Sequence, residues 1–221
     1  MSLFTVDKPF NKANNEYYCD ARRLQISGFL LSLLIAVFGA VIWWQAGSGV
    51  ATALGIFLVV AAVFYAFVSA SITRTLDKPQ DLYDNNPLCA AMIAEVEPRS
   101  MTLLALVDRD KSATDSASLD ILKQPALAVR TVTKIAGTPR SVGTRVPSVA
   151  VGGNNRKKNE AYDQITAVSV AWATPKTTDV KKAEQAIDDR VWQLLQSHLD
   201  KVAEVRDTKN DLMPISAKNR D

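Results

Sequence analysis

The sequence predicts a membrane α-hairpin of two transmembrane helices, followed by a cytoplasmic α+β domain. In this domain a small curled antiparallel β-sheet or barrel precedes C-terminal helices. Three observations lead to the prediction. No charged residue occurs from Leu24 to Thr73. Short segments with strand periodicity, separated by turn residues, follow in residues 90–175. From Asp179 onward, the apolar residues recur at helical spacing.

The uncharged block is long enough for two membrane spans. A helix needs about 20 apolar residues to cross the hydrocarbon core, and the block divides into residues 24–44 and 50–72 around the small turn 45–49. Trp43 and Trp44 end the first span at the depth where amphipathic rings prefer to lie. A cleaved signal peptide fits poorly, because the preceding tail contains acidic residues and the apolar run is too long.

The charges beside the spans predict the orientation of the hairpin. Arg22 and Arg23 precede the first span, Arg74 follows the second, and the connecting turn has no basic residue. Because Lys and Arg are retained on the cytoplasmic side, we expect a protein of the plasma membrane with both termini in the cytoplasm. The same three arginines are placed to contact anionic lipid head groups.

Small residues recur at helical spacing along both spans, namely Ala36, Gly39, Ala40, Ala62, Ala66 and Ala70. Such residues let helices approach closely, so these stripes either pack the hairpin on itself or dock it on a larger membrane complex. Neither span contains the ionisable side chains that a proton relay or an ion path needs. The hairpin is therefore predicted to act as an anchor or a docking element.

Composition divides the chain into six segments: a cytoplasmic N-terminal tail (1–23), the hairpin (24–73), a linker (74–89), the β-rich domain (90–175), helices packing on the sheet (176–209) and a polar tail (210–221). Residues 79–87 are rich in turn formers, which is typical of a polar linker. The final tail is expected to be loose unless it binds a partner.

About five short strands are predicted, at residues 90–97, 101–107, 126–135, 143–151 and 167–173. Residues 97–100 favour a hairpin turn, residues 108–125 an excursion loop, and Gly137–Pro139 another turn. Pro147 suggests that the fourth strand contains a bulge or lies at an edge. Strict alternation in the fifth places Val168, Val170 and Trp172 on one face.

Two helices are predicted after the sheet, at residues 181–187 and 190–206, with Asp188 and Asp189 as caps of the longer one. This longer helix carries an apolar stripe that is expected to lie against the sheet. The stripe consists of Val191, Leu194, Leu195, Leu199, Val202 and Val205.

No motif predicts catalysis. His198 is the only histidine in the chain, and a zinc site would need further ligands beside it. Glu95 and Glu97, like Asp108 and Asp110, are spaced to share one face of a strand, although a solvent-facing edge and a turn are the simpler interpretations. We therefore expect no enzyme, no catalytic, cofactor-binding or metal-binding residues, and no cofactor.

Basic residues and cysteines give weaker signals. The pair Gly152–Gly153 lacks the following helix N-terminus that a phosphate site would use. The triplet Arg156–Lys158 is either a solvated loop or a contact for anionic lipids or an acidic subunit. A net charge of +3 is too weak to argue for nucleic acid. Cys19 and Cys89 are isolated thiols, which suits a reducing compartment.

Several segments together resemble a corynebacterial family of membrane proteins of unknown function. The resemblance spans nearly the whole chain and includes the charge-free hairpin, with further segments at Asp20–Leu24, Ala94–Arg99, Leu103–Asp108, Leu127–Thr133, Arg145–Val151 and Asp207–Lys209. It carries no catalytic motif, so it implies no site residues. A chain of this size and topology is also similar to a small accessory subunit of the actinobacterial cytochrome bcc–aa3 respiratory supercomplex.

The sequence and these resemblances lead to two expectations about function. The first is a non-catalytic accessory or stabilising subunit of a membrane complex, with the respiratory supercomplex as the implied partner. The alternative is a stand-alone, membrane-tethered module for binding or regulation in envelope or lipid machinery. Co-purification of a large complex would distinguish the first expectation from the second.

Overall fold

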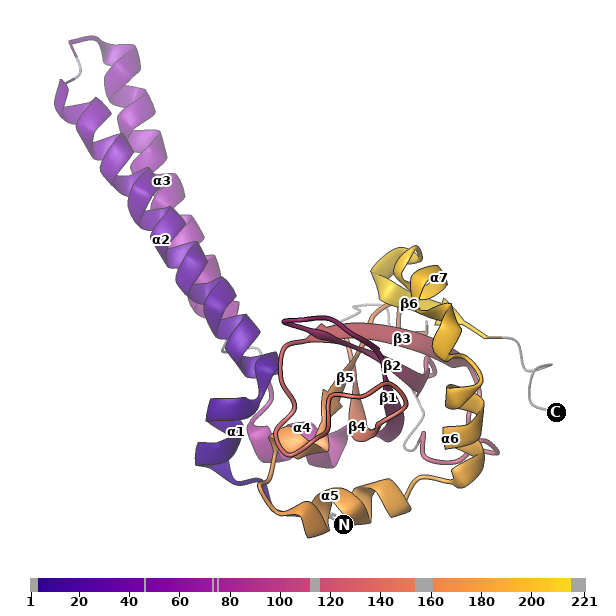
Figure 1. Ribbon diagram of the computed structural model, residues 1–221. Coiled ribbons are helices and arrows are strands. Elements are labelled where there is room, and N and C mark those ends of the chain that lie inside the picture. Colours follow the sequence, from indigo (N-terminus) through magenta and orange to yellow (C-terminus); the bar gives the residue numbers. More distant parts are fainter. Residues whose placement is uncertain are drawn as a thin grey trace. The chain divides into compact units, whose positions relative to one another are not determined.

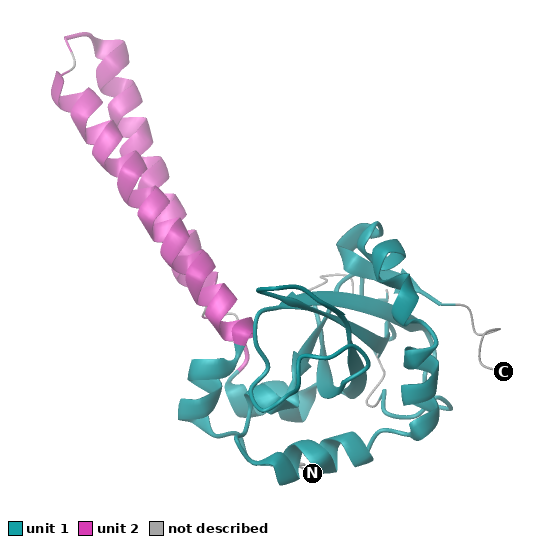
Figure 2. Ribbon diagram, in the orientation of Figure 1, with its two compact units in different colours: residues 1–15, 78–221 teal, residues 16–77 magenta. Residues whose placement is uncertain are grey.

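The computed structural model describes residues 4–45, 47–72, 74, 76–111, 116–153 and 161–215 (Figure 1). The chain forms two compact units. Residues 16–77 form the hairpin unit, and residues 1–15 and 78–221 together form the soluble unit (Figure 2). The soluble unit is therefore built from chain on both sides of the hairpin. The triplet Arg156–Lys158 lies outside the described residues.

The hairpin unit consists of α2 (Glu16–Gln45) and α3 (Gly49–Ile72), two antiparallel helices that contact each other along their length (Figure 1). Both predicted spans lie within them, and α2 begins earlier than the predicted first span. The large apolar side chains of both helices mostly point outward: Leu34 is 67% exposed and Phe67 71%. Two helices of this length and hydropathy, so little buried in the protein, suit a bilayer.

A seam of small side chains holds the two helices together. The buried residues are Ser32 and Gly39 on α2 and Gly55, Ala62 and Ser69 on α3. Within each helix these positions are seven apart, which keeps one face of the helix toward its partner. Gly39 and Ala62 therefore pack the hairpin on itself, as one of the two interpretations of the small-residue stripes expects.

Not every residue of the predicted stripes belongs to this seam. Ala40 is exposed, while Ala36, Ala66 and Ala70 are partly exposed. These positions lie outside the closest approach of the two helices, which is made by glycines. A Cβ built on Gly55 would lie only 2.8 Å from the carbonyl oxygen of Gly39. The seam therefore requires glycine at this crossing.

The soluble unit contains one six-stranded antiparallel sheet that curls into a half-barrel, followed by C-terminal helices (Figure 1). This is the predicted fold class. The strand order is β5-β4-β1-β2-β3-β6. The strands are β1 (Leu88–Val96), β2 (Met101–Asp108), β3 (Pro125–Val132), β4 (Arg145–Gly152), β5 (Ile165–Ser169) and β6 (Leu212–Pro214).

The first four predicted strands match β1 to β4 within a few residues. The predicted turn between β1 and β2 is closed by a hydrogen bond from the Glu97 N–H to the Ser100 carbonyl (2.9 Å). The predicted turn before β4 is also present, because Gly137 adopts a φ of 70°, a conformation that suits glycine. A register shift between Ile93 and Glu95 forms a bulge in β1.

Pro147 predicts a bulge in β4 or a place for this strand at the sheet edge. Both predictions are wrong for the strand as a whole, because β4 pairs with β1 and β5 on its two sides without a register shift. The Ala150 N–H bonds the Pro87 carbonyl toward β1 (2.9 Å), so odd-numbered β4 residues direct their N–H groups toward β5. β5 ends at Ser169, opposite Ser148. An N–H group at position 147 would point toward β5, but β5 has already ended there. The missing N–H of Pro147 therefore removes no hydrogen bond from the sheet.

The fifth predicted strand is correct only in its first half. β5 ends at Ser169, and Val170–Trp172 form the short 3₁₀ helix η2. The Ser169 hydroxyl accepts a hydrogen bond from the Ala171 N–H (3.1 Å) and so ends the strand. Val170 and Trp172 are still buried, but on a helical turn and not on one face of a strand. Alternating apolar residues cannot distinguish these two conformations over so short a stretch.

The outer edge of β5 is covered by side chains instead of another strand. Three side chains donate to carbonyls along this edge: Tyr83 Oη to Ser169 (3.0 Å), Arg130 Nη1 to Ala167 (3.0 Å) and Asn210 Nδ2 to Asp163 (2.9 Å). Arg130 comes from β3, so its side chain reaches across the open side of the half-barrel. An uncovered edge invites pairing with another chain, and these donors occupy it.

The predicted linker at residues 79–87 is a helix over most of its length. α4 (Pro79–Asn85) begins at a proline, which suits the first turn of a helix. Its Leu82 and Tyr83 are buried, and this burial gives the polar segment a fixed place on the soluble unit. On the other side of the hairpin, part of the predicted N-terminal tail forms α1 (Lys8–Asn14), which Asp7 caps at its N-terminus.

The first C-terminal helix is longer than predicted, and the second is interrupted. α5 (Thr177–Gln185) begins before the expected start, and Asp188 caps α6 (Asp189–Gln196) as expected. The predicted long helix is interrupted at His198 and continues as η3 (Leu199–Lys201) and α7 (Val202–Arg206). Most of its predicted stripe is nevertheless buried, including Val191, Leu195, Val202 and Val205.

The C-terminal tail is partly structured. The 3₁₀ turn η4 (Lys209–Asp211) precedes β6, which pairs with β3 through residues such as Leu212 opposite Ala128. The expectation of a loose tail is therefore wrong for residues 212–214, because β6 completes the sheet. Residues 216–221 lie outside the described part of the chain.

Candidate functional site

His198 is a structural residue. Its side chain is 5% exposed, and Nδ1 lies 2.8 Å from the Leu194 carbonyl and 3.0 Å from the Ser197 hydroxyl. These contacts hold the imidazole against the end of α6, where the helix stops. Among the described residues, no group of three or more His, Cys, Asp or Glu side chains is placed to hold a metal ion.

Glu95 of β1 and Glu97 of the following turn do not form a pair. The Glu95 carboxylate bonds Nη2 of Arg206 on α7 (2.8 Å), whereas the Glu97 carboxylate accepts a hydrogen bond from the Ser100 hydroxyl in the turn (2.7 Å). Each carboxylate therefore connects the sheet to a different neighbour. The arrangement positions α7 and the turn and brings no two acids together for chemistry.

The two aspartates at the end of β2 organise the loop that follows. Asp108 is buried, and its carboxylate accepts backbone N–H bonds from Asp110 (2.9 Å), Lys123 (2.7 Å) and Gln124 (3.0 Å). Asp110 forms an ion pair with Lys123 (3.4 Å). A carboxylate that accepts several N–H bonds is typical of a turn-forming residue. Both aspartates therefore tie the ends of the excursion loop together.

The glycine pair and Cys89 offer no reactive group. The Gly153 N–H donates to the Gln164 carbonyl (2.8 Å), and a Cβ on Gly152 would collide with the ring of Tyr162. This backbone is thus committed to the sheet. Cys89 is completely buried, and desolvation raises the pKa of its thiol to about 12. Cys19 on α2 is partly exposed and forms no disulfide.

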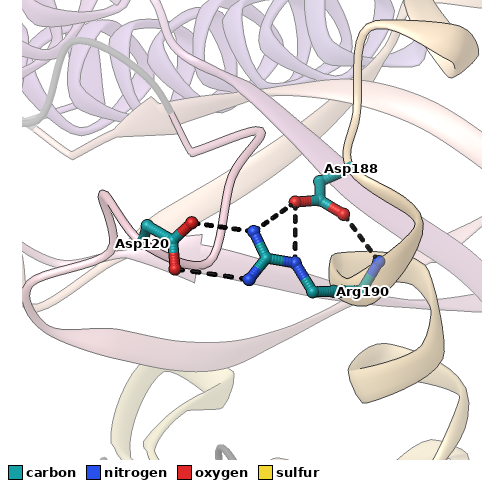
Figure 3. Close-up of polar contacts among 3 residues, drawn as sticks. All are labelled: Asp120, Asp188 and Arg190. Carbon is teal, nitrogen blue, oxygen red and sulfur yellow. Dashed lines mark hydrogen bonds and ion pairs between the residues drawn. The ribbon is translucent and has the colours of Figure 1, made fainter.

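An ion-pair network fixes the start of α6 (Figure 3). Arg190 Nη2 lies 2.7 Å from carboxylate oxygens of both Asp120 and Asp188. Hydrogen bonds from the Arg190 side chain and backbone hold the pKa of Asp188 below its usual value. Bonds to Asp120 and Asp188 in turn raise the pKa of Arg190. The network joins the excursion loop to α6. Both of its carboxylates, those of Asp120 and Asp188, are bound by Arg190.

The segments that flank the hairpin are joined within the soluble unit. Asn15, the last residue before α2, donates from Nδ2 to the Tyr83 hydroxyl on α4 (3.1 Å). The Val6 N–H donates to the Gln80 side chain (2.9 Å), and the rings of Phe4 and Tyr83 stack edge to face with centroids 5.5 Å apart. We call these residues the clasp: Phe4, Val6, Asn15, Gln80 and Tyr83.

Within the hairpin unit, a further hydrogen bond joins the start of α2 to the segment after α3. The Tyr18 hydroxyl at the start of α2 donates to the carbonyl of Asp77, beyond the end of α3 (2.9 Å). The chain therefore enters and leaves the hairpin at neighbouring points. Sequence analysis missed both contacts, because residues that bond each other lie on opposite sides of a charge-free block of about fifty residues.

The soluble unit contains a cleft of about 510 Å³. It lies between α1, the turn before β4, η2 and α5. Phe10, Pro139 and Val180 contribute to its apolar lining, and Arg145, Lys181 and Glu184 contribute charges. Sequence analysis missed this cleft, because its walls come from segments far apart in the chain.

Comparison with known proteins places the chain in a family. The family model DUF3239, described as a protein of unknown function, matches residues 74–203, which is more than half of the chain. The chain belongs to this family. Comparison with curated proteins gave no match.

A solved structure is also similar to this chain. The crystal structure of a candidate membrane protein from Corynebacterium diphtheriae is 39% identical to this chain, with a TM-score of 0.51. The likeness covers 58% of this chain and 99% of that one. The DUF3239 match begins beyond α3, and all of it from Lys78 onward lies in the soluble unit. Together with the two apolar helices, these similarities identify a membrane protein with a DUF3239 domain.

Proposed function

We propose that the chain is a non-catalytic, membrane-anchored docking subunit whose hairpin binds a larger complex within the bilayer. The observation that carries this proposal is the hairpin itself: two helices without Asp, Glu, Lys, Arg or His in the spans and with large apolar side chains directed outward. Such a surface can contact lipid or other helices but cannot conduct ions or relay protons. The carboxylates and the histidine considered above serve structural contacts, which favours a binding role for the soluble unit.

The specific complex that we propose is the actinobacterial bcc–aa3 respiratory supercomplex. The support is the similarity of size and topology noted above, together with the corynebacterial solved structure. An affinity-tagged form of the full chain, extracted in a mild detergent, should bring down the cytochrome subunits in fixed stoichiometry. Their consistent absence at endogenous expression levels would contradict this part of the proposal.

A chimaera separates docking by the hairpin from simple membrane tethering. In it, residues 16–77 are replaced by an unrelated two-span hairpin of equal length, and the soluble unit is retained. If the hairpin docks, the chimaera should reach the membrane yet lose the complex. If the chimaera retains the complex, the soluble unit is the docking element.

We further propose that the soluble unit lies in the cytoplasm. Two observations support this topology: Arg22, Arg23 and Arg74 flank the spans, and the clasp joins segments from both sides of the hairpin within one unit. The second observation requires an even number of crossings between the clasped segments. It therefore supports both flanks on the same side, and the arginines support the cytoplasmic side.

Cysteine labelling of intact cells tests this topology. In a Cys19→Ser background, Ser48→Cys in the turn should react with a membrane-impermeant maleimide added outside. Gln193→Cys, exposed on α6, should react only after permeabilisation. Labelling of position 193 on intact cells would contradict the proposal, because it would place the soluble unit outside.

The alternative, a stand-alone binding or regulatory module, is favoured by one observation. The soluble unit has a cleft large enough for a small ligand. A stable monomer in native gels after mild extraction would favour this alternative over the docking subunit. The two roles differ in what the hairpin contributes: a binding surface in the first, and only membrane attachment in the second.

A further inference from the structure

We propose that α1 is a strap through which the hairpin acts on the soluble unit: a greater tilt of the hairpin in the bilayer releases α1 from η2. Three features carry this inference: the one-residue connection between α1 and α2, the longer connection between α3 and α4, and the weak attachment of α1. The inference goes beyond the docking role proposed above and does not depend on the identity of a docking partner.

The first feature is the connection that enters the hairpin. A single residue, Asn15, separates α1 from α2. Its N–H donates to the Asn11 carbonyl (2.8 Å), and its side chain donates to the buried Tyr83 hydroxyl. α2 then runs without interruption from Glu16 into the span predicted from Leu24, so residues 16–23 add about 12 Å of helix outside the span. Tilting the span therefore displaces the start of α2, and Asn15 with it.

The second feature is the connection that leaves the hairpin, which is longer. α3 ends at Ile72, α4 begins at Pro79, and residues 73–78 lie between them in the sequence. Six residues offer more soft backbone torsions to absorb a movement than one residue does. The hydrogen bond from the Tyr18 hydroxyl to the Asp77 carbonyl ties this segment to α2, but it is exposed and water can replace it. A movement of the hairpin is therefore transmitted mainly to α1.

The third feature is the attachment of α1 to the rest of the soluble unit. α1 has seven residues, too few for a helix that is stable by itself, and its buried residue is Asn11. Its contacts with η2 include two polar ones at carbonyls: the Asp7 N–H donates to Ala173 (2.9 Å), and Asn11 Nδ2 donates to Trp172 (3.3 Å). Elements that bury little apolar surface open at low free energy. α1 is therefore an element that a moving hairpin can detach.

Release of α1 would change two places on the soluble unit. Phe10 of α1 contributes to the lining of the cleft, so its departure would open the cleft on that side. The carbonyls of Trp172 and Ala173 would lose their donors from the N-terminal segment and meet water instead. A docking partner that fixed the tilt of the hairpin would thereby set the state of this surface.

Hydrogen–deuterium exchange of the full chain in nanodiscs tests the coupling. The nanodiscs contain phosphatidylcholines with monounsaturated chains of 14, 18 or 22 carbons, which form bilayers of increasing thickness. A span that is longer than the bilayer is thick tilts, so the hairpin should tilt most in the thinnest bilayer. We expect the amides of α1 to exchange about fivefold faster there than in the thickest bilayer, the effect of losing one hydrogen bond. The amides of β2 should exchange equally in all three.

Two insertions of the same flexible sequence show whether α2 transmits the movement. Gly-Ser-Gly-Ser inserted between Asn15 and Glu16 should abolish the dependence on bilayer thickness, because the hairpin can then tilt without moving α1. The same four residues inserted between Gly47 and Ser48, in the turn that joins α2 to α3, should leave the dependence in place. Unchanged exchange of β2 in both proteins confirms that the sheet is intact.

A substitution that weakens the attachment provides a second test. Asn15→Ala removes the hydrogen bond to Tyr83 and should speed the exchange of α1 by about fivefold in every bilayer. Lys8→Ala, at an exposed position of the same helix, is the matched control and should not speed it.

Three results would overturn the proposal. The first is exchange of α1 that is the same in all three bilayers, including exchange that is complete at the earliest time. The second is a dependence on thickness that survives the insertion after Asn15. The third is equal loss of this dependence with the insertion after Gly47, since the connection between α1 and α2 would then have no special role.

Discussion

The hydroxyl of Tyr83 accepts a hydrogen bond from Asn15 Nδ2 (3.1 Å) and donates one to the Ser169 carbonyl (3.0 Å). Asn15 precedes the hairpin, Tyr83 follows it, and Ser169 ends β5. One phenol therefore joins the two flanks of the hairpin to the edge of the sheet. All three residues are buried, so this hydroxyl lies where unmet hydrogen bonds are costly.

Replacing Tyr83 with Phe tests the importance of this junction. The change removes one hydroxyl and leaves the buried Ser169 carbonyl without that donor, which should cost about 1–3 kcal/mol of unfolding free energy. Denaturant unfolding of the full chain, followed by near-ultraviolet circular dichroism, measures it. The matched control is Tyr162→Phe, whose hydroxyl bonds no described residue. Equal effects of the two changes would show that the hydroxyl of Tyr83 adds nothing.

Features encoded by neighbouring residues could be predicted from the sequence. The hairpin follows from a continuous charge-free block, and the β1–β2 turn from a short run around Pro98. Asp188 was recognisable as a helix cap, because a capping side chain acts on the next few residues. In each case the decisive signal lies within a single segment of the chain.

Features made by distant residues could not be predicted. α4 has the composition of a linker, and only burial of Tyr83 against the N-terminal segment makes it a fixed helix. β6 is three residues long and is defined by its pairing with β3. The cleft combines Phe10 with Lys181, which lie at opposite ends of the sequence. The candidate site therefore became visible only in three dimensions.

The Asp188–Arg190 pair predicts a pH dependence in acid. Hydrogen bonds from Arg190 lower the pKa of Asp188 below its ordinary value of 3.8. A carboxyl whose pKa is lower in the folded state stabilises that state at higher pH, and this contribution is lost as the pH falls through the folded-state value. The unfolding temperature of the wild type should therefore exceed that of Asp188→Asn near pH 6, with the difference vanishing below pH 3.8.

Asn and Ala at this position separate the cap from the charge. Asn retains a side-chain oxygen that can cap α6, so Asp188→Asn should have a small effect, as expected for an exposed ion pair. Asp188→Ala removes the cap as well and should lower the unfolding temperature further at every pH. If the wild type and Asp188→Asn keep a constant difference down to low pH, the charge of Asp188 is not responsible.

Cys89 predicts a second dependence, in alkali. Its folded-state pKa of about 12 exceeds the ordinary value of 9.0 because the thiol is desolvated. Between these values the unfolded chain releases a proton that the folded chain retains, so stability falls as the pH rises. The slope should be about 1.4 kcal/mol per pH unit for this one group. Denaturant unfolding at pH 8, 9, 10 and 11 measures it.

A thiol-free variant isolates this contribution. Cys89→Ala should be less stable than the wild type near neutral pH, because the smaller side chain leaves space in the core. Its stability should then fall less steeply above pH 9, by the equivalent of one proton. Cys19→Ala, in the hairpin unit, serves as the control for removing a thiol. Parallel alkaline slopes for the wild type and Cys89→Ala would contradict the prediction.

The crossing of Gly39 and Gly55 predicts that a single methyl group disturbs the hairpin. A Cβ on Gly55 would lie 2.8 Å from the Gly39 carbonyl oxygen and 2.8 Å from the backbone nitrogen of Trp43. Because these are backbone atoms of α2, the helices must move apart to accept it. Gly55→Ala should therefore destabilise the hairpin by about 1–3 kcal/mol, the usual cost of overpacking.

Gly49→Ala provides the matched control, since a Cβ at this position meets no atom within 4 Å. Both changes replace glycine with a better helix former in α3, so any difference between them reports the crossing. Unfolding of the full chain from mixed micelles by increasing amounts of SDS, followed by tryptophan fluorescence, measures both. Gly55→Ala should unfold at a lower SDS fraction than the wild type, and Gly49→Ala at an equal or higher one. Coincident unfolding curves for the two variants would contradict the prediction, because the close approach at Gly39 and Gly55 would then not limit the stability of the hairpin.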